Sequence, residues 1–463
     1  MIASITVAAF FAIAISVYAH PRLPSIFLSL LGLCLIGYAF LGRGFAYLPF
    51  APLFIGEILL AVGIIAILLS GCLMRALHSS ISWLLVCFML LGALATLPHV
   101  GQYGLDSFRD AVIWGYGIFA LLVASFMLRS AWIARTVNSY RRLLPWFLFW
   151  SPLAVVVYRL GIDLIPTVPD GAVPLLSPKG GDIGVHLAGI LAFMVLGLTR
   201  HATASVRKWP SHSEWLWWLL WLAAFLTIAN VRAAVLSVFS VVFLILLVRP
   251  LSRWGKVLFL SVVLATGFVA LDIEIRLTPH RAVSVENFVL TAQSILGDTG
   301  EASYDGTRGW RLMWWTEIVN YTVFGEYFWI GKGYGINLAS ADGYQVYSDE
   351  SLRSPHNGHL TILARNGVPG ALAWLILQGA FATKLILGYF RAHGHGQEWW
   401  AKVNLWILCY WLAFMVNGAF DVFLEGPQGG IWFWSVFGFG IAALEMQERG
   451  YAERGAQRAS GAI

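Results

Sequence analysis

Two histidines stand where a long polar segment meets an apolar run, in the sequence SPHNGH at residues 354–359. Pro355 cannot continue a preceding helix, so we expect His356 at the start of the next helix. A histidine can take a proton from a hydroxyl near neutral pH, and His356 is therefore our candidate general base. The alternative is a solvated polar residue at a helix start.

The same two histidines could share a metal ion, since His356 and His359 are three residues apart. No carboxylate or cysteine stands at ligand spacing beside them. We therefore expect no metal site and no cofactor. Asn357 and His359 are kept as candidates that line the same cavity as His356.

Arginines form the second group of candidates. Arg232 lies between two apolar runs, in the sequence ANVRAA at residues 229–234, and Arg308 and Arg311 lie beside several tryptophans. A guanidinium can bind a phosphate through two hydrogen bonds, and an arginine at headgroup level would meet the diphosphate of a lipid. The alternatives are a snorkelling side chain for Arg232 and interfacial anchoring for Arg308 and Arg311.

The composition shows what must surround these residues. The chain has 463 residues, of which 59% are hydrophobic and only 12% are charged. These values exclude a soluble two-domain enzyme and a disordered chain, and four cysteines give no secreted disulfide scaffold. A polytopic all-α membrane protein remains. Its net charge of +6 indicates cytoplasmic loops rather than nucleic-acid binding.

Long apolar runs in a bilayer must be helices here, because every lipid-facing backbone group has to be satisfied internally. We expect about 12–14 transmembrane helices, and the run at 357–390 is long enough to be tilted or broken. The runs lie near residues 2–19, 25–42, 51–73, 81–98, 110–128, 144–162, 183–199, 214–229, 232–248, 256–273, 357–390, 403–420 and 429–446. The first run lacks a charged start and a convincing cleavage site, so we expect a retained span, with a signal peptide as the alternative.

Positive charges predict the orientation. Lys and Arg gather in segments around residues 129–142, 200–208, 249–256 and 384–402 and in the tail from 449. The positive-inside rule places these in the cytoplasm. Residues 163–182, 274–355 and 421–428 then lie on the opposite side of the membrane.

The chain divides into transmembrane helices at 1–273, a periplasmic loop at 274–355, transmembrane helices with the histidine motif at 356–446 and a cytoplasmic tail at 447–463. Loops as long as 274–355 are usually functional. Within the loop, residues 310–321 have the spacing of an amphipathic helix on the membrane surface, held there by tryptophans 310, 314 and 315. Glycines 331, 333 and 335 then predict a tight turn.

Several of these residues resemble a known family. His356-Asn357, nine further residues and then GVPG at 367–370 resembles the H-[NSQ]-x9-G-x-x-G pattern of the bacterial O-antigen ligase and polymerase superfamily. RLMWW at 311–315 followed by GKGYG at 331–335 is similar to that family's R-L-x-x-W helix and G-x-G turn, and NVRAA at 230–234 to its intramembrane arginine motif. The resemblance covers about residues 180 to 440.

The resemblance implies a GT-C-like, metal-independent glycosyltransferase of the bacterial inner membrane, with its active site facing the periplasm. It would transfer an undecaprenyl-diphosphate-linked saccharide to an acceptor hydroxyl, as an O-antigen or exopolysaccharide polymerase or as an O-antigen ligase. Carried over by motif, His356 would activate the hydroxyl, and Arg232 and Arg311, with Arg308, would hold the donor diphosphate. The implied partners are the lipid-linked donor, a glycan or lipid A-core acceptor, the bilayer and, for a polymerase, a chain-length regulator.

Other classes stay open. A flippase or transporter for lipid-linked glycans would use the same cationic cavity without a base, and a scaffold subunit would need no cavity arginines. The segment between Arg311 and His356 is short for a ligase that docks a lipopolysaccharide core, and residues 421–428 look closer to the polymerases. Asp182 and His186, at the outer start of the run 183–199, are further cavity-lining candidates, with packing or helix capping as the alternative for Asp182.

Overall fold

The computed structural model is a helical bundle that describes residues 22–50, 53–128, 130–168, 173–199, 212–249, 275–278, 281–283, 293 and 302–460. Its first half contains α2 (Leu23–Leu41), α3 (Arg43–Ala46), α4 (Ile55–Ser70), α5 (Leu73–Ala76), α6 (Ser80–Thr96), α7 (Val100–Tyr103), α8 (Leu105–Gly115), α9 (Gly117–Phe126), α10 (Ser130–Leu160), α11 (Gly180–Val195), α12 (His212–Leu226) and α13 (Arg232–Val248). Its second half contains α16 (Ala302–Val323), α17 (Leu338–Ala341), α18 (Gly358–Gly394), α19 (Glu398–Gly418) and α20 (Pro427–Ser460). Strands among the described residues form only two small hairpins, β1 (Pro49–Phe50) with β2 (Leu53–Phe54) and β3 (Ile275–Thr278) with β4 (Arg281–Val283).

Six helices among the described residues are long and apolar enough to cross a membrane, in α2, α6 with its extension to Tyr103, α10, α18, α19 and α20. The pair α8 and α9, bent by 45°, is a seventh candidate, and α4, α12, α11 and α13 contain shorter apolar helices. The prediction of an all-α polytopic membrane protein is confirmed. The predicted runs at 2–19 and 256–273 lie outside the described residues, so the total number of spans stays a prediction.

The outer surface of the bundle has the apolar character that a bilayer requires. Leu94 on α6 and Leu375 on α18 are 66% and 60% exposed, and other large apolar side chains share such positions on α2 and α10. In water such a surface would be a liability, whereas in lipid it is solvated. We therefore treat these faces as lipid-facing.

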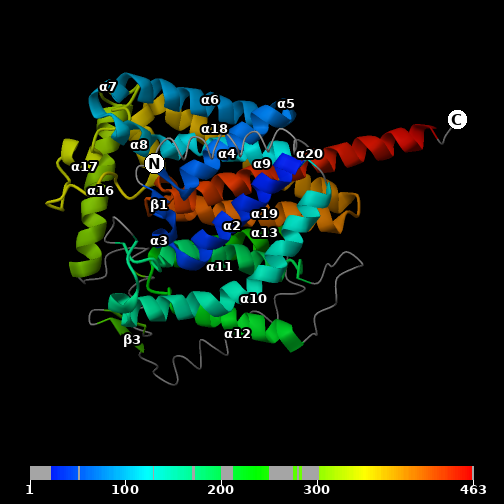
Figure 1. The fold of residues 1–463 in the computed structure, drawn as a ribbon, viewed down its shortest axis with the longest axis horizontal. Coiled ribbons are helices and arrows are strands. Elements are labelled where there is room, and N and C mark those ends of the chain that lie inside the picture. The colour runs from blue at the N-terminus through cyan, green and yellow to red at the C-terminus, as the bar shows by residue number, and fades with distance from the viewer. Residues whose placement is uncertain are drawn as a thin grey trace, which may run out of the picture.

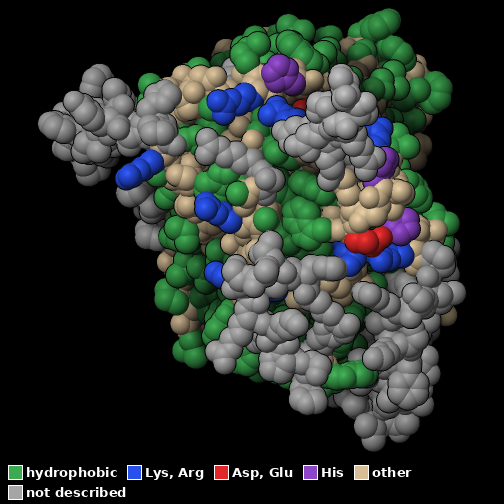
Figure 2. All heavy atoms as spheres, turned by 90° about the vertical axis from the view of Figure 1, so that its right-hand side faces the viewer, with side chains coloured by type: hydrophobic (Ala, Val, Ile, Leu, Met, Phe, Trp, Pro, Cys, Tyr) green, Lys and Arg blue, Asp and Glu red, His purple; other side chains and the backbone are tan. Residues whose placement is uncertain are grey.

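The two ends of the bundle differ (Figure 1). Helix α16 runs across one end, whereas the C-terminal part of α20 extends from the other. We call the end that carries α16 and residues 324–357 the loop end. Figure 2 views the opposite end and shows Lys and Arg side chains spread over it. That this end faces the cytoplasm stays a prediction. Helix α20 continues to Ser460 without a break at 446, so the predicted tail begins as helix.

Helix α16 is longer than the predicted 310–321, and its tryptophans contact protein. Trp314 is fully buried and donates a 2.6 Å hydrogen bond to Asp342, and Trp310 packs against both Trp314 and Tyr344. Trp315 donates to a backbone carbonyl of the loop end. The expectation that Trp314 holds the helix on the bilayer is wrong, because Trp314 is buried inside the loop. For Trp310 and Trp315, which are half-buried, it stays a prediction.

Close packing of α11 on α13 brings their N-terminal ends together at the loop end. A Cβ atom added to Gly184 would lie 2.4 Å from the Cβ of Ala234, and one added to Gly180 would lie 2.7 Å from the side chain of Val231. Small residues let two membrane helices approach in this way. This contact brings the first residues of α11 and α13, including Arg232, close together.

Candidate active site

His356 lies in the turn that leads into α18. The side chain of Asn357 caps this helix by accepting hydrogen bonds from the amides of His359 and Leu360, at 3.0 and 3.1 Å. His356 itself has a φ of 53°, a left-handed conformation that is uncommon for residues other than glycine. The structure therefore places His356 just outside the helix, in a strained conformation of the kind that clusters at functional sites.

Two neighbouring elements hold this turn. The indole of Trp315 on α16 donates a 2.9 Å hydrogen bond to the carbonyl of Pro355, directly before His356. The hydroxyl of Thr361 on α18 donates a 2.8 Å hydrogen bond to Glu425, which ends the short helix η4 (Phe423–Glu425). The turn and the first part of α18 are thus attached to α16 and to the segment after α19.

Arg311 lies one turn before Trp315 on α16, at the same end of the bundle. Its Nη1 donates a 3.2 Å hydrogen bond to the carbonyl of Phe420, two residues beyond α19. Burial lowers the pKa of Arg311, the Asp421 carboxylate raises it, and the nearby charge of Arg232 lowers it further. The site thus holds two guanidinium groups that repel each other.

Lys179 and Asp421 form an ion pair in the same place, with Nζ 2.6 Å from Oδ1. Lys179 is the residue before α11, and Asp421 directly follows the residue that accepts from Arg311. Burial lowers the pKa of Lys179, but the carboxylates of Asp421 and Asp182 outweigh it, and the pKa is raised overall. Lys179 is therefore protonated at neutral pH and adds a positive charge to the site.

His356 lies within the field of all these charges. Burial lowers its pKa, Arg311 and Lys179 lower it further, and Asp421 opposes them; the resulting pKa is about 4. The imidazole is therefore neutral at neutral pH. A neutral imidazole beside cations can accept a proton, whereas a protonated one could not.

The structure brings Arg232, Arg311 and His356 to one end of the bundle, as the sequence motifs predict. Arg232 is the first residue of α13 and half-buried, and its charge acts on Arg311. Arg308 lies one turn before Arg311 on α16 and is also half-buried. That these arginines bind a diphosphate stays a prediction.

The other candidates have contacts within the protein. Both ring nitrogens of His359 are used, since Nε2 contacts the carbonyl of Met415 at 2.9 Å and Nδ1 accepts from Trp374 at 3.1 Å. His186 is buried deeper in the bundle, where its Nδ1 contacts the hydroxyl of Tyr410. Asp182 is buried in the first turn of α11 and acts on the Lys179 charge.

The predicted glycine turn is present, and it lies against a break in α18. Gly331, Gly333 and Gly335 have φ values of 64°, 74° and 110°, and Gly367 interrupts α18 with a φ of 64°. The amide of Lys332 donates to the carbonyl of Ala364 at 2.7 Å, next to this break. A Cβ atom on Gly331 would lie 2.4 Å from backbone of α18, so only glycine allows the approach. Gly367, the glycine that follows the nine-residue spacing of the histidine motif, thus lies where the loop contacts α18.

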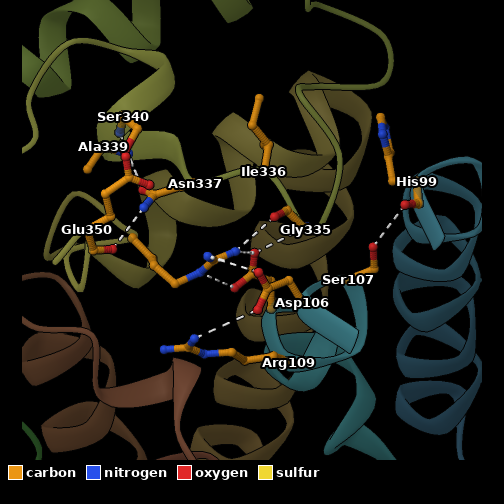
Figure 3. Close-up of polar contacts among 12 residues, drawn as sticks. His99, Asp106, Ser107, Arg109, Gly335, Ile336, Asn337, Ala339, Ser340 and Glu350 are labelled. Atoms are coloured by element: carbon orange, nitrogen blue, oxygen red, sulfur yellow. Dashed lines mark hydrogen bonds and ion pairs between the residues drawn. The ribbon is translucent and has the colours of Figure 1, made fainter. Parts of the chain in front are cut away.

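The sequence analysis missed a charge network beside this turn (Figure 3). Asp110 of α8 lies 2.9 Å from the guanidinium of Arg353 and 2.9 Å from that of Arg365. Figure 3 labels Asp106 of the same helix, whose carboxylate lies 3.4 Å from Arg353. Its carboxylate also accepts from the amide of Gly335, and Arg353 donates to the carbonyl of Gly335 at 2.8 Å. Arg353 belongs to the segment that leads to His356, so the network fixes that segment to α8. The available signal was the presence of charges at 110 and 365 inside apolar runs.

Lys179, Asp421 and Trp315 were also missed as parts of the site. Lys179 and Asp421 stand in two short segments on the predicted outer side, and neither residue was a candidate for the site. Trp315 belongs to the R-L-x-x-W pattern, but its hydrogen bond to Pro355 depends on the fold. No group of three His, Cys, Asp or Glu side chains within the described ranges could hold a metal ion.

The fold is a membrane-embedded helical bundle, and its candidate site is a neutral histidine among cations at one end. These two features define the class of the protein, a polytopic membrane protein with a candidate general base. The O-antigen ligase family matches residues 216–375, which include Arg232, Arg311, His356 and Gly367. This match supports the O-antigen ligase and polymerase superfamily as the family of the chain, and a membrane enzyme of polysaccharide assembly as its activity. No curated protein matches the chain.

Proposed function

We propose that the protein is a metal-independent glycosyltransferase that transfers a saccharide from undecaprenyl diphosphate to an acceptor hydroxyl at the periplasmic face of the bacterial inner membrane. The observation that carries the proposal is the place of His356 at the loop end, where it is half-buried and its pKa responds to the charges of Arg311, Lys179 and Asp421. The acceptor is a growing glycan if the protein is a polymerase, or lipid A-core if it is a ligase.

In this proposal His356 is the general base. A ring nitrogen takes the proton of the acceptor hydroxyl while the oxygen attacks the anomeric carbon of the donor sugar. The bond from that carbon to the diphosphate oxygen breaks, and the diphosphate leaves with the electron pair. The neutral state of His356 at neutral pH supports this role.

Arg311 and Arg232 bind the diphosphate as it leaves. They come from different elements, α16 and α13, and in the absence of an anion the charge of Arg232 lowers the pKa of Arg311. A diphosphate between them would relieve this repulsion, and its developing charge would be stabilised by groups already in place. Arg308, one turn along α16, extends the same cationic surface.

The lipid bilayer is a further partner in this proposal, because it holds the lipid part of the donor. The undecaprenyl chain would lie in the bilayer with its diphosphate at headgroup level, which is where the loop end is expected. A chain-length regulator would be a partner of the polymerase alternative.

The test is transfer by purified protein in lipid nanodiscs, with a lipid-linked oligosaccharide donor and a chelator present. Wild-type protein is expected to transfer the saccharide, and His356→Ala to bind the donor but lose about 10²- to 10⁴-fold in rate. Binding lost together with transfer would show that His356 is a phosphate ligand. Transfer that requires a divalent ion would contradict the metal-independent mechanism.

A further inference from the structure

The Lys179–Asp421 ion pair suggests how donor binding and the base are connected. Resting on the function proposed above, we propose that Lys179 is a third cation of the donor site, which the donor diphosphate takes from Asp421 when it binds. Asp421, released from its partner, then acts on His356. Lys179 contacts the diphosphate directly, whereas Asp421 acts through the histidine and is a positioning residue.

The geometry brings three charged groups to one short segment. Arg311 donates to the carbonyl of Phe420, and Lys179 pairs with the next residue, Asp421. Helix α11 approaches the same segment, since a Cβ atom on Gly181 would lie 3.5 Å from Asp421 Oδ2. A diphosphate bound by Arg311 would therefore lie within reach of the Lys179 side chain.

The pair is accessible on its lysine side. The side chain of Lys179 is 43% exposed, whereas that of Asp421 is only 14% exposed. An ammonium group on a flexible stem can change partners without the loss of a planar two-bond arrangement, which would hold an arginine in place. A diphosphate carries more negative charge than one carboxylate, so it competes well for this cation.

Residue Lys179 is itself fixed near this position by the segment before it. The amide of Ser177 donates to the carbonyl of Leu41, and the carbonyl of Ser177 accepts from the amide of Arg43, at 2.9 and 3.0 Å. These contacts hold the chain at the end of α2, while α11 begins directly after Lys179. The exchange therefore requires only a movement of the lysine side chain.

The exchange would change the strength of the base. The charged groups around His356 are Arg311 from α16, Lys179 before α11 and Asp421 after α19, with Arg232 beside Arg311, and Asp182 and Arg43 beside Lys179. While Lys179 neutralises Asp421, the cations dominate and His356 is a weak base. Once Lys179 turns to the diphosphate, the Asp421 carboxylate is free to raise the pKa of His356. The base becomes stronger only when a donor is present.

Binding of undecaprenyl diphosphate to the full-length protein in nanodiscs tests the exchange. Lys179→Met is expected to weaken binding about 10-fold, because one charged contact is lost, and Lys179→Arg to restore most of it. Asp421→Asn is expected to tighten binding, since Lys179 is then free. In the double variant the tightening should largely disappear, because it depends on Lys179.

Three results would overturn the exchange: wild-type binding by Lys179→Met, no tightening by Asp421→Asn, or equal tightening by Asp421→Asn with and without Lys179. Arg311→Lys serves as the reference. If it weakens binding while Lys179→Met does not, only the exchange fails; if neither does, the proposed function fails.

The separation between two acid limbs of the pH profile gives a second measurement. Removing a lysine that never leaves Asp421 would move both limbs together and leave their separation unchanged. In wild type the acid limb of kcat, which reports the donor complex, should lie at higher pH than the limb of kcat/KM for the donor. In Lys179→Met the limb of kcat/KM should move upward, so that the two limbs approach each other. An unchanged separation in a folded Lys179→Met protein would contradict the exchange.

Discussion

The indole of Trp315 donates a 2.9 Å hydrogen bond to the carbonyl of Pro355, so that helix α16 holds the residue before His356. One turn away on α16, Arg311 donates to the carbonyl of Phe420 after α19. Helix α16 therefore connects the turn before α18 to the segment after α19. The proposed base and the proposed diphosphate ligand are positioned by the same helix.

Removing the Trp315 hydrogen bond should slow transfer without unfolding the protein. In Trp315→Phe the ring is kept and only the donor is lost, so the turn before His356 becomes less well fixed, and kcat is expected to fall about 10-fold. Trp310→Phe is the matched control, since Trp310 packs against Trp314 and Tyr344 instead. Equal kcat values for the two variants would show that the hydrogen bond does not position the base.

Replacing Arg311 by lysine should test the clamp. Arg311→Lys keeps the charge but loses the planar guanidinium and its hydrogen bond to Phe420. Donor turnover is expected to fall about 10²-fold, as when one preorganised donor to a developing anion is removed. Turnover near that of wild type, at equal protein levels, would mean that Arg311 only anchors α16.

The pH profile should show an unusually weak base in the free enzyme. Because burial, Arg311 and Lys179 lower the pKa of His356 to about 4, the imidazole stays neutral as the pH falls from 7 toward 5. The value of kcat/KM for the donor should therefore be flat in this range and fall only through about pH 4, where the base is protonated. A fall centred on the ordinary histidine pKa of about 6.5 would contradict this electrostatic environment.

Gly367 should be intolerant of any side chain. Its φ is 64°, and a Cβ atom there would lie 2.4 Å from the carbonyl oxygen of Phe328, so Gly367→Ala must displace the glycine turn from α18. We expect a large fall in melting temperature and loss of transfer. Gly379→Ala, further along the same helix with open space around it, should leave stability unchanged or raise it by about 0.5–1 kcal/mol. Similar melting temperatures for both variants would refute this account of the break.

The sequence predicts the elements of this protein better than their contacts. The predicted apolar runs within the described ranges are mainly helical, because a long apolar run in a bilayer has no other stable conformation. The run at 110–128 is the exception to a single helix, since it includes the 45° bend between α8 and α9. The motifs also predict that His356, Arg311 and Arg232 gather at one end. The three residues gather there because each one stands at the boundary of an apolar run or in the long loop, and such boundaries meet at a membrane surface.

Contacts between distant segments could not be predicted in this way. Lys179 and Asp421 are 242 residues apart, and only the packing of α11 against α19 brings them together. The spacing of tryptophans on α16 shows a helical face but not whether lipid or protein covers it. The sequence therefore predicts a membrane contact for Trp314, whereas in the structure Trp314 is buried and bonded to Asp342.

The network around Asp110 should contribute to stability as well as to the position of His356. Asp110→Asn removes the charge that pairs with Arg353 and with Arg365, of which Arg365 is only 2% exposed. Leaving a buried guanidinium without its carboxylate typically costs about 3–5 kcal/mol, so we expect a strongly lowered melting temperature in detergent. Arg109→Ala is the control: Arg109 pairs with Asp106 at 3.8 Å on the surface, and exposed pairs contribute about 0–1 kcal/mol. If Asp110→Asn and Arg109→Ala have the same melting temperature, the network does not hold the loop on α8.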